Sequence, residues 1–133
     1  MVCVSSSSYS LSINNRLQAP FKGMKGLRQG DPLSSFLFVI TMEYLTRALQ
    51  SLWVQRGFQG HPKCKKLKII NLSFADDLLV FCKAEVNSVL AIKEVLDNFS
   101  SSSSLHISPT KSMVFLGGIS QNLKQEIKSI FPF

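Results

Sequence analysis

The chain has 133 residues, which is the size of one domain and enough for a small hydrophobic core. Fifteen Lys and Arg residues against eight Asp and Glu residues give a formal charge of +7, which suits a nucleic-acid partner. Three scattered cysteines argue against a disulfide framework and predict an intracellular protein, and the apolar run after Leu33 is interrupted by Glu43 and too short to span a membrane.

The first predicted element is a strand near the N-terminus. Residues Tyr9–Ile13 alternate in polarity, and Asn14-Asn15 would turn the chain back. No positively charged segment precedes an apolar core in this region, so a secretory signal is not evident. Basic residues then cluster at Lys22-Lys25-Arg28.

A long helix is predicted after Gly30. Asp31 can cap its free N–H groups and Pro32 suits the first helical position, so the helix should run to about Trp53 and end before Gly57. Apolar residues at helical spacing predict its buried face: Leu33, Leu37, Ile40, Tyr44 and Ala48, widened by Phe36, Val39 and Leu52.

The segment before this helix is a candidate binding site. Gly26-Leu27-Arg28-Gln29-Gly30 places flexible backbone, a cation and an amide at a helix N-terminus, where a phosphate or nucleotide can be received. A well-capped core helix without any ligand explains the same residues.

A polar connection over residues 57–66 follows, and a second basic cluster overlaps it. The cluster consists of Arg56, Lys63, Lys65, Lys66 and Lys68. It suits a phosphate backbone and, taken alone, equally suits a solvated loop. His61 and Cys64 resemble half of a zinc site, but the sequence has no second half, which favours a loop.

Two adjacent carboxylates occupy the turn of a predicted hairpin. The apolar flanks Ile69–Phe74 and Leu78–Cys82 predict two strands, and Asp favours a turn at Ala75–Leu78. The repulsion between Asp76 and Asp77 would be relieved by a divalent cation with oxygen ligands. Taken alone, such a pair is more often simply a polar turn.

The C-terminal part predicts two helices and a strand. A helix over Glu85–Phe99 would be stopped by the serines at 100–104, with a face toward the sheet formed by Val86, Val89, Leu90, Leu96 and Phe99. A strand at Ser112–Leu116 would close at Gly117-Gly118, and Ser120 would cap a last helix. The order of elements predicts an α+β fold, a layer of sheet with helices on one face.

Three motifs occur in the order found in reverse transcriptases. They are Arg-Gln-Gly-Asp-Pro-Leu-Ser at 28–34, Phe-Ala-Asp-Asp at 74–77, and Lys111-Ser112 ahead of Phe115-Leu116-Gly117. The residues of these motifs most resemble those of the LINE-type (non-LTR) retrotransposons of plants, and the resemblance extends over about Tyr9 to Gly118. The resemblance implies that residues 1–133 are a partial polymerase palm, with an antiparallel sheet that carries the catalytic hairpin and helices on one face.

The resemblance also implies an activity and roles for single residues. The activity is RNA-directed DNA polymerisation by two-metal nucleotidyl transfer, with Mg²⁺ or Mn²⁺ as cofactor and RNA template, DNA primer and dNTPs as partners. Asp76 would be the main carboxylate ligand, Asp77 would assist it, and Phe74 would pack beneath the hairpin. The other implied roles are template or nucleotide contact for Arg28, Gln29 and Gly30, pyrophosphate contact or general acid catalysis for Lys111, and a primer grip at Phe115, Leu116 and Gly117.

The sequence departs from the family pattern at several positions. The family supplies a further catalytic aspartate ahead of Gln29-Gly30, together with nucleotide-binding fingers, and no acidic residue precedes Asp31 here. We therefore expect a palm that lacks the fingers, the thumb and the strand with the first catalytic aspartate. Such a palm should have no catalytic activity on its own. Ser35 replaces the usual Pro, and Ser104-Leu105 replaces Gly-Leu, a lost Gly that would cost about 1 kcal/mol if the turn needs positive φ.

Three interpretations follow from these observations. The chain is a polymerase domain active within a longer polyprotein, a module that binds RNA or primer–template without chemistry, or a translated relic that folds poorly. Nuclear action follows from the family's lifestyle alone, and the sequence does not specify an oligomeric state.

Overall fold

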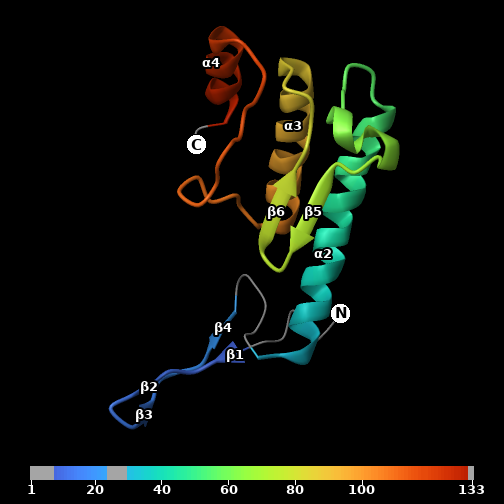
Figure 1. Cartoon of the computed structure of the whole chain (residues 1–133). Helices are drawn as coiled ribbons and strands as arrows, with labels where there is room; N and C mark the ends of the chain where they lie inside the picture. Colours follow the sequence, from blue (N-terminus) through green and yellow to red (C-terminus); the bar gives the residue numbers. More distant parts are fainter. Residues whose placement is uncertain (1–7, 24–29, 132–133) are drawn as a thin grey trace. The chain divides into compact units, whose positions relative to one another are not determined.

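The computed structural model describes residues 8–23 and 30–131 and divides the chain into two units (Figure 1). The first unit is Met1–Ile40 and the second is Thr41–Phe133, so helix α2 (Pro32–Ser51) contributes residues to both. Within the described ranges, no helix has the length and apolar character needed to cross a membrane.

The N-terminal unit contains an antiparallel ribbon. Its strands pair as two short ladders: β1 (Ser8–Tyr9) with β4 (Phe21–Lys22), and β2 (Ser12–Ile13) with β3 (Arg16–Leu17). Asn14 and Asn15 turn the ribbon with φ of 51° and 60°, a conformation that Asn tolerates better than most residues. The predicted turn is confirmed, and the predicted strand is divided into β1 and β2.

Helix α2 begins and ends where the sequence predicted. The backbone N–H of Leu33 donates to Asp31 Oδ1 at 2.9 Å, and Pro32 is the first helical residue. A 3₁₀ helix, η1 (Leu52–Val54), extends the C-terminal end, and Gly57 follows with φ of 95°. These local signals act within one turn of the chain, which is why the sequence revealed them.

The predicted buried face of α2 is wrong for most of the helix. Leu52, which follows in η1, is buried as predicted. The buried side chains within α2 are Leu45 and Leu49, which the prediction omitted, whereas the predicted Ile40 and Tyr44 are 65% and 57% exposed. Apolar residues occupy most of the circumference of this helix, so helical spacing alone does not select one face. The contacts with the rest of the second unit select it.

The core of the second unit joins α2, a β-hairpin and α3 (Val86–Ser103). The hairpin consists of β5 (Asn71–Phe74) and β6 (Asp77–Val80), and Leu78 and Val80 pack against the buried residues. Those buried residues are Leu45, Leu49, Leu52, Ile70, Ile92, Leu96 and Phe99. Figure 1 shows the hairpin lying along α3 and the adjacent part of α2. Helices and small antiparallel sheets fit the α+β class, but in the described residues the strands form three two-stranded sheets instead of one layer.

The C-terminal helices confirm one predicted cap and correct one predicted end. Helix α4 (Gln121–Ile130) begins at Ser120, whose Oγ accepts a hydrogen bond from the Leu123 N–H at 3.4 Å. Helix α3 does not stop at the serine run but continues to Ser103, because hydroxyls such as Ser103 Oγ donate back to a carbonyl one turn earlier. It ends at Ser104 with φ of 61°.

The inward face of α3 also differs from the prediction at two positions. Val89, Leu96 and Phe99 are buried as predicted. Leu90 is 47% exposed, and Ile92, which the prediction omitted, is buried. Two positions apart along a helix, side chains point to different faces. The element that packs against α3 therefore determines which of these residues is buried.

Gly60 makes a close contact that predicts a large effect on stability. A Cβ at this position would overlap the indole ring of Trp53, with two further ring carbons at 2.6 and 2.7 Å. The ring is also held edge-on against Phe58, with centroids 5.8 Å apart. We expect Gly60→Ala to lower the free energy of unfolding by about 2–3 kcal/mol, measured by urea denaturation.

Gly117→Ala provides the matched control for this substitution. No atom lies within 4 Å of the position of its Cβ, so the change should stay within about 0.5 kcal/mol of zero. Equal losses in the two variants would contradict the packing of Trp53 on Gly60.

Candidate functional site

The two adjacent aspartates occupy different positions of the β5–β6 hairpin. Phe74 pairs directly with Asp77, which leaves Ala75 and Asp76 as a two-residue turn. Asp77 is therefore the first residue of β6, and the turn is shorter than the predicted Ala75–Leu78. Both carboxylates are exposed, and neither forms a hydrogen bond or ion pair with another described residue. They are open to solvent and to a cation.

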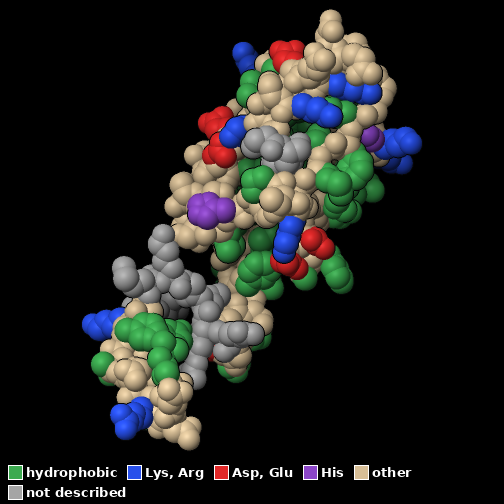
Figure 2. All heavy atoms as spheres, turned by 90° about the vertical axis from the view of Figure 1, so that its left-hand side faces the viewer, with side chains coloured by type: hydrophobic (Ala, Val, Ile, Leu, Met, Phe, Trp, Pro, Cys, Tyr) green, Lys and Arg blue, Asp and Glu red, His purple; other side chains and the backbone are tan. Residues whose placement is uncertain are grey.

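The pairing register gives the hairpin an inner and an outer face. Leu78 and Val80 pack against the core, and residues alternate along a strand, so Asp77 and Leu79 face outward. Phe74 lies opposite Asp77 on that outer face and is 83% exposed, so the prediction that it packs beneath the hairpin is wrong. Exposed apolar side chains are also visible on the face shown in Figure 2.

The turn that carries Asp76 has a strained backbone. Ala75 has φ of 50°, a left-handed conformation that costs an L-residue roughly 1–2 kcal/mol. Leu78 and Val80, inserted into the core two and four residues after Asp76, hold the strands that impose this conformation. A turn under such constraint presents Asp76 in a defined position.

We expect Ala75→Gly to stabilise the chain slightly. Relief of the left-handed conformation outweighs the greater freedom of Gly in the unfolded state, so the free energy of unfolding should rise by about 0.5 kcal/mol. The control is Ala91→Gly inside α3, which should lower it by about 1 kcal/mol. Urea denaturation measures both, and a loss at Ala75 equal to that at Ala91 would contradict the strained turn.

The predicted nucleotide-binding block is described only in part. Arg28 and Gln29 lie outside the described residues. Gly30 has φ of 82° and stands directly before the capping Asp31, and no other described residue places an atom within 4 Å of where a Cβ would be. Gly30 is exposed at the start of α2. Gly30 belongs to the first unit, and Asp76 and Asp77 belong to the second.

Lys111 lies in an exposed turn. Its backbone N–H donates to the Ser108 carbonyl at 3.2 Å. No hydrogen bond or ion pair joins it to Asp76 or Asp77 in the described part of the chain. The structure therefore brings the two aspartates together but does not add Lys111 to them.

The segment after Lys111 corrects the predicted strand. Exposure alternates along residues 111–116, as expected for extended chain, but Ser112–Leu116 pairs with no strand in the described regions. Phe115 is 85% exposed, Leu116 is half-buried and Gly117 is exposed. An extended segment becomes a strand only when a neighbouring edge accepts its hydrogen bonds, and alternation cannot show that edge.

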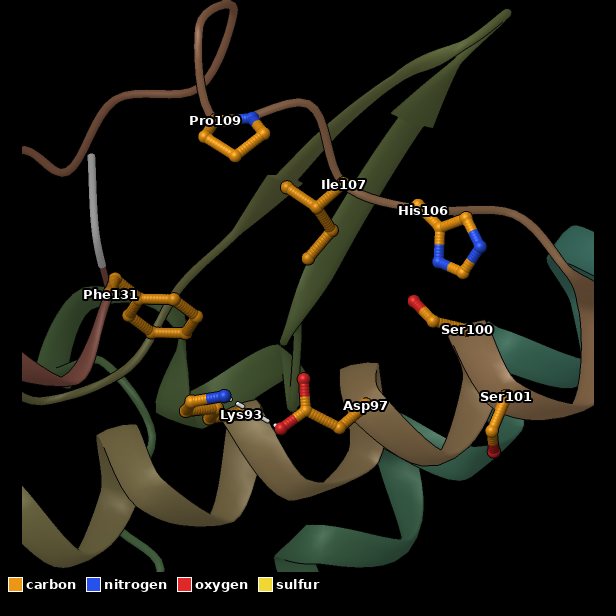
Figure 3. A pocket seen from close by; sticks show the side chains of 8 residues that line it. All are labelled: Lys93, Asp97, Ser100, Ser101, His106, Ile107, Pro109 and Phe131. Atoms are coloured by element: carbon orange, nitrogen blue, oxygen red, sulfur yellow. Dashed lines mark hydrogen bonds and ion pairs between the residues drawn. The ribbon is translucent and has the colours of Figure 1, made fainter.

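A pocket of about 410 Å³ lies between α3 and the segment that follows it, and none of the residues assigned to the predicted site lines it (Figure 3). Ile107 points toward α3 from the segment that follows the helix, and Lys93 and Asp97, an ion pair at 2.7 Å, line the side formed by α3. The remaining lining residues are Ser100, Ser101, His106, Pro109 and Phe131. Sequence reasoning missed it because its walls come from separate parts of the chain, and the i,i+4 charge pair on α3 was its one local signal.

Cys64 and Cys82 are the cysteines in the described part of the chain. Cys64 Sγ lies 3.9 Å from His61 Nδ1, but within the described ranges no group of three or more His, Cys, Asp or Glu residues is placed to hold a metal ion. Burial raises the pKa of the Cys82 thiol from 9.0 to about 11, so it stays protonated at neutral pH. His61 caps the 3₁₀ helix Pro62–Leu67, in which Cys64 lies, so the predicted loop is in part a short helix.

The two carboxylates at the hairpin are oxygen donors of the kind that divalent cations bind. Mg²⁺ is commonly held by one or two carboxylates, with water and substrate phosphate oxygens completing its coordination. Asp76 and Asp77 supply carboxylates of that kind on exposed backbone. The pair does not suit a closed structural site, which would need more protein ligands.

Comparison with known proteins gives one family. The family model described as "Reverse transcriptase (RNA-dependent DNA polymerase)" matches residues 2–129. The matched range includes every residue assigned to the predicted site. No solved structure matches the chain.

Proposed function

Since the chain belongs to the reverse transcriptase family, we propose that it forms the palm of a non-LTR retrotransposon polymerase and that β5–β6 is its catalytic hairpin. The family is that of RNA-directed DNA polymerases, so an RNA template and a primer are the implied partners. The residues of the three motifs support the assignment of residues 1–133 to the palm. They also support the non-LTR origin.

One observation carries the proposal. Asp76 stands on a constrained turn and Asp77 on the strand beside it, both exposed, while Leu78 and Val80 anchor the same hairpin in the core. A polymerase must hold metal-binding carboxylates in a fixed position and leave them accessible to nucleotide and primer. The hairpin meets both requirements.

Each residue has a distinct part in the proposed reaction. Asp76 holds the divalent cation, and Asp77 assists from the first position of β6. The bound Mg²⁺ or Mn²⁺ would stabilise the attacking and leaving oxygens of nucleotidyl transfer. Gly30 allows close approach of template or nucleotide, Lys111 supplies a positive charge for the pyrophosphate, and the exposed Phe115 contacts the primer with Leu116 and Gly117.

Metal binding by the isolated chain tests this assignment. In two-dimensional amide NMR spectra, Mn²⁺ should broaden the signals of residues 75–78 in the wild-type chain, because a bound paramagnetic ion acts on nearby nuclei. Asp76→Asn should remove the effect. Glu94→Gln, which removes an exposed carboxylate of α3, should leave it unchanged. Broadening that persists in Asp76→Asn, or that appears only elsewhere, would contradict the assignment.

A further inference from the structure

The connection between α2 and β5 carries unpaired positive charge. Between Glu43 and Asp76 the sequence contains six Lys and Arg residues and no acidic residue. Arg47 is paired with Glu43 at 2.8 Å, but the other five are exposed and form no ion pair with any described residue. These five are Arg56, Lys63, Lys65, Lys66 and Lys68. No ion pair with a described residue therefore neutralises these five charges.

The lysines stand on an ordered element. Residues Pro62–Leu67 form a 3₁₀ helix, η2, in which Lys63 and Lys66 are one turn apart and point to the same side, about 6 Å along the axis. At its start, His61 Nδ1 accepts a hydrogen bond from the Lys63 N–H at 3.3 Å. At its end, Lys68 has φ of 50° and its N–H bonds to the carbonyls of Cys64 and Lys65.

Contacts with other parts of the second unit hold the chain on both sides of η2. Before η2, the Gln59 N–H donates to the buried Ser88 Oγ at 2.9 Å, and the Gln59 carbonyl accepts from the Lys83 N–H at 2.9 Å. After η2, Ile70 is 1% exposed and belongs to the core. A backbone held in this way loses little conformational freedom on binding, so its charges are available at a low entropic cost.

The lysine helix is separate from the proposed catalytic turn. It precedes β5, whereas Ala75 and Asp76 follow β5, so the two lie at opposite ends of the hairpin (Figure 1). None of its lysines was assigned to template, nucleotide or primer above.

We propose that Lys63, Lys65 and Lys66 form a second contact site, which binds the phosphate backbone of single-stranded RNA independently of the carboxylates. Lys ammonium groups act as point charges that contact phosphates without reading sequence, which suits a polymerase that must hold any template. The choice of RNA as the partner rests on the proposed function, while the surface itself is defined by charge, exposure and order.

Two triple variants with the same change of charge test the site. Lys63→Gln with Lys65→Gln and Lys66→Gln removes three charges from η2, and Arg16→Gln with Lys124→Gln and Lys128→Gln removes three elsewhere. Lys68 is left intact because of its positive φ. Binding of a fluorescent single-stranded RNA of mixed sequence is measured by anisotropy over a range of KCl concentrations, without nucleotide or divalent metal.

The η2 variant should lose both affinity and salt dependence. Each lost phosphate contact lowers the slope of log affinity against log salt by about 0.7, so three contacts lower it by about 2, and affinity falls up to about 100-fold at roughly 0.1 M salt. The control variant should keep the wild-type slope within about 0.7. Equal losses in both variants would overturn the proposal, because the effect would then follow net charge alone.

Footprinting of the wild-type chain decides the matter even if a variant fails to fold. RNA should protect Lys63, Lys65 and Lys66 from acetylation, read by mass spectrometry, and leave Lys124 and Lys128 reactive. Absence of protection would overturn the proposal, as would protection by phosphatidylserine vesicles without protection by RNA. Asp76→Asn should bind RNA as the wild type does. A negative result in the Mn²⁺ test would therefore contradict only the proposed function, and a negative result in the RNA-binding test would contradict only the η2 site.

Discussion

Asp76→Asn is expected to abolish RNA-templated primer extension by a polymerase that carries this chain, with a loss on the order of 10³-fold or more. Asn preserves the size of the side chain and is well tolerated in turns, so the hairpin should keep its register. What it removes is the negative charge that holds the cation. The measurement is the rate of nucleotide incorporation on an RNA template with a DNA primer.

Three comparisons make this result specific. Glu94→Gln removes an exposed carboxylate from α3 and should leave extension unchanged. RNA binding by Asp76→Asn should equal that of the wild type, which would separate lost chemistry from lost substrate. Asp77→Asn should also be severe, because Asp77 is the first residue of β6 and lies beside the turn. Extension retained by Asp76→Asn would show that this carboxylate is not the metal ligand.

Leu49→Ala is expected to have the largest effect on stability among the substitutions considered. Leu49 is fully buried, with 0% exposure, and belongs to the core that joins α2 to Ile70 and α3. Truncation removes apolar contacts and leaves a cavity, so the free energy of unfolding should fall by about 3 kcal/mol. Urea denaturation measures the loss.

Ile40→Ala is the matched control on the same helix. Ile40 belongs to the face that the sequence pattern favoured, but it is 65% exposed. Its truncation should cost no more than about 0.5 kcal/mol. A larger loss at Ile40 than at Leu49 would show that the face predicted by periodicity is the buried one after all.

Local signals in the sequence were sufficient where a few adjacent residues decide the structure. Asp31 and Pro32 start α2, Asn14-Asn15 turns the first ribbon, and Ser120 caps α4. In each case a side chain or a tolerated φ acts on backbone within about one turn, and the rest of the fold is not needed. The order of the motifs likewise indicated the family that the match over residues 2–129 shows.

Patterns failed where a distant partner makes the choice. The apolar residues around α2 permit several buried faces, and the core selected that of Leu45 and Leu49. Residues Ser112–Leu116 alternate in exposure but do not form a strand, because no strand of the described residues pairs with them. The serine run stayed helical through Ser103, and the hydroxyls of Ser101, Ser102 and Ser103 each donate to a carbonyl one turn back.

The candidate site shows the same division. The sequence by itself determined that Asp76 and Asp77 are adjacent and that lysines cluster ahead of β5. The tertiary structure decided that Asp76 lies on a strained turn, that Phe74 is exposed, and that the lysines stand on an ordered 3₁₀ helix. The reason is physical: adjacency follows from covalent connectivity, whereas exposure and orientation depend on which surfaces bury each other, and those surfaces come from residues far apart in the chain.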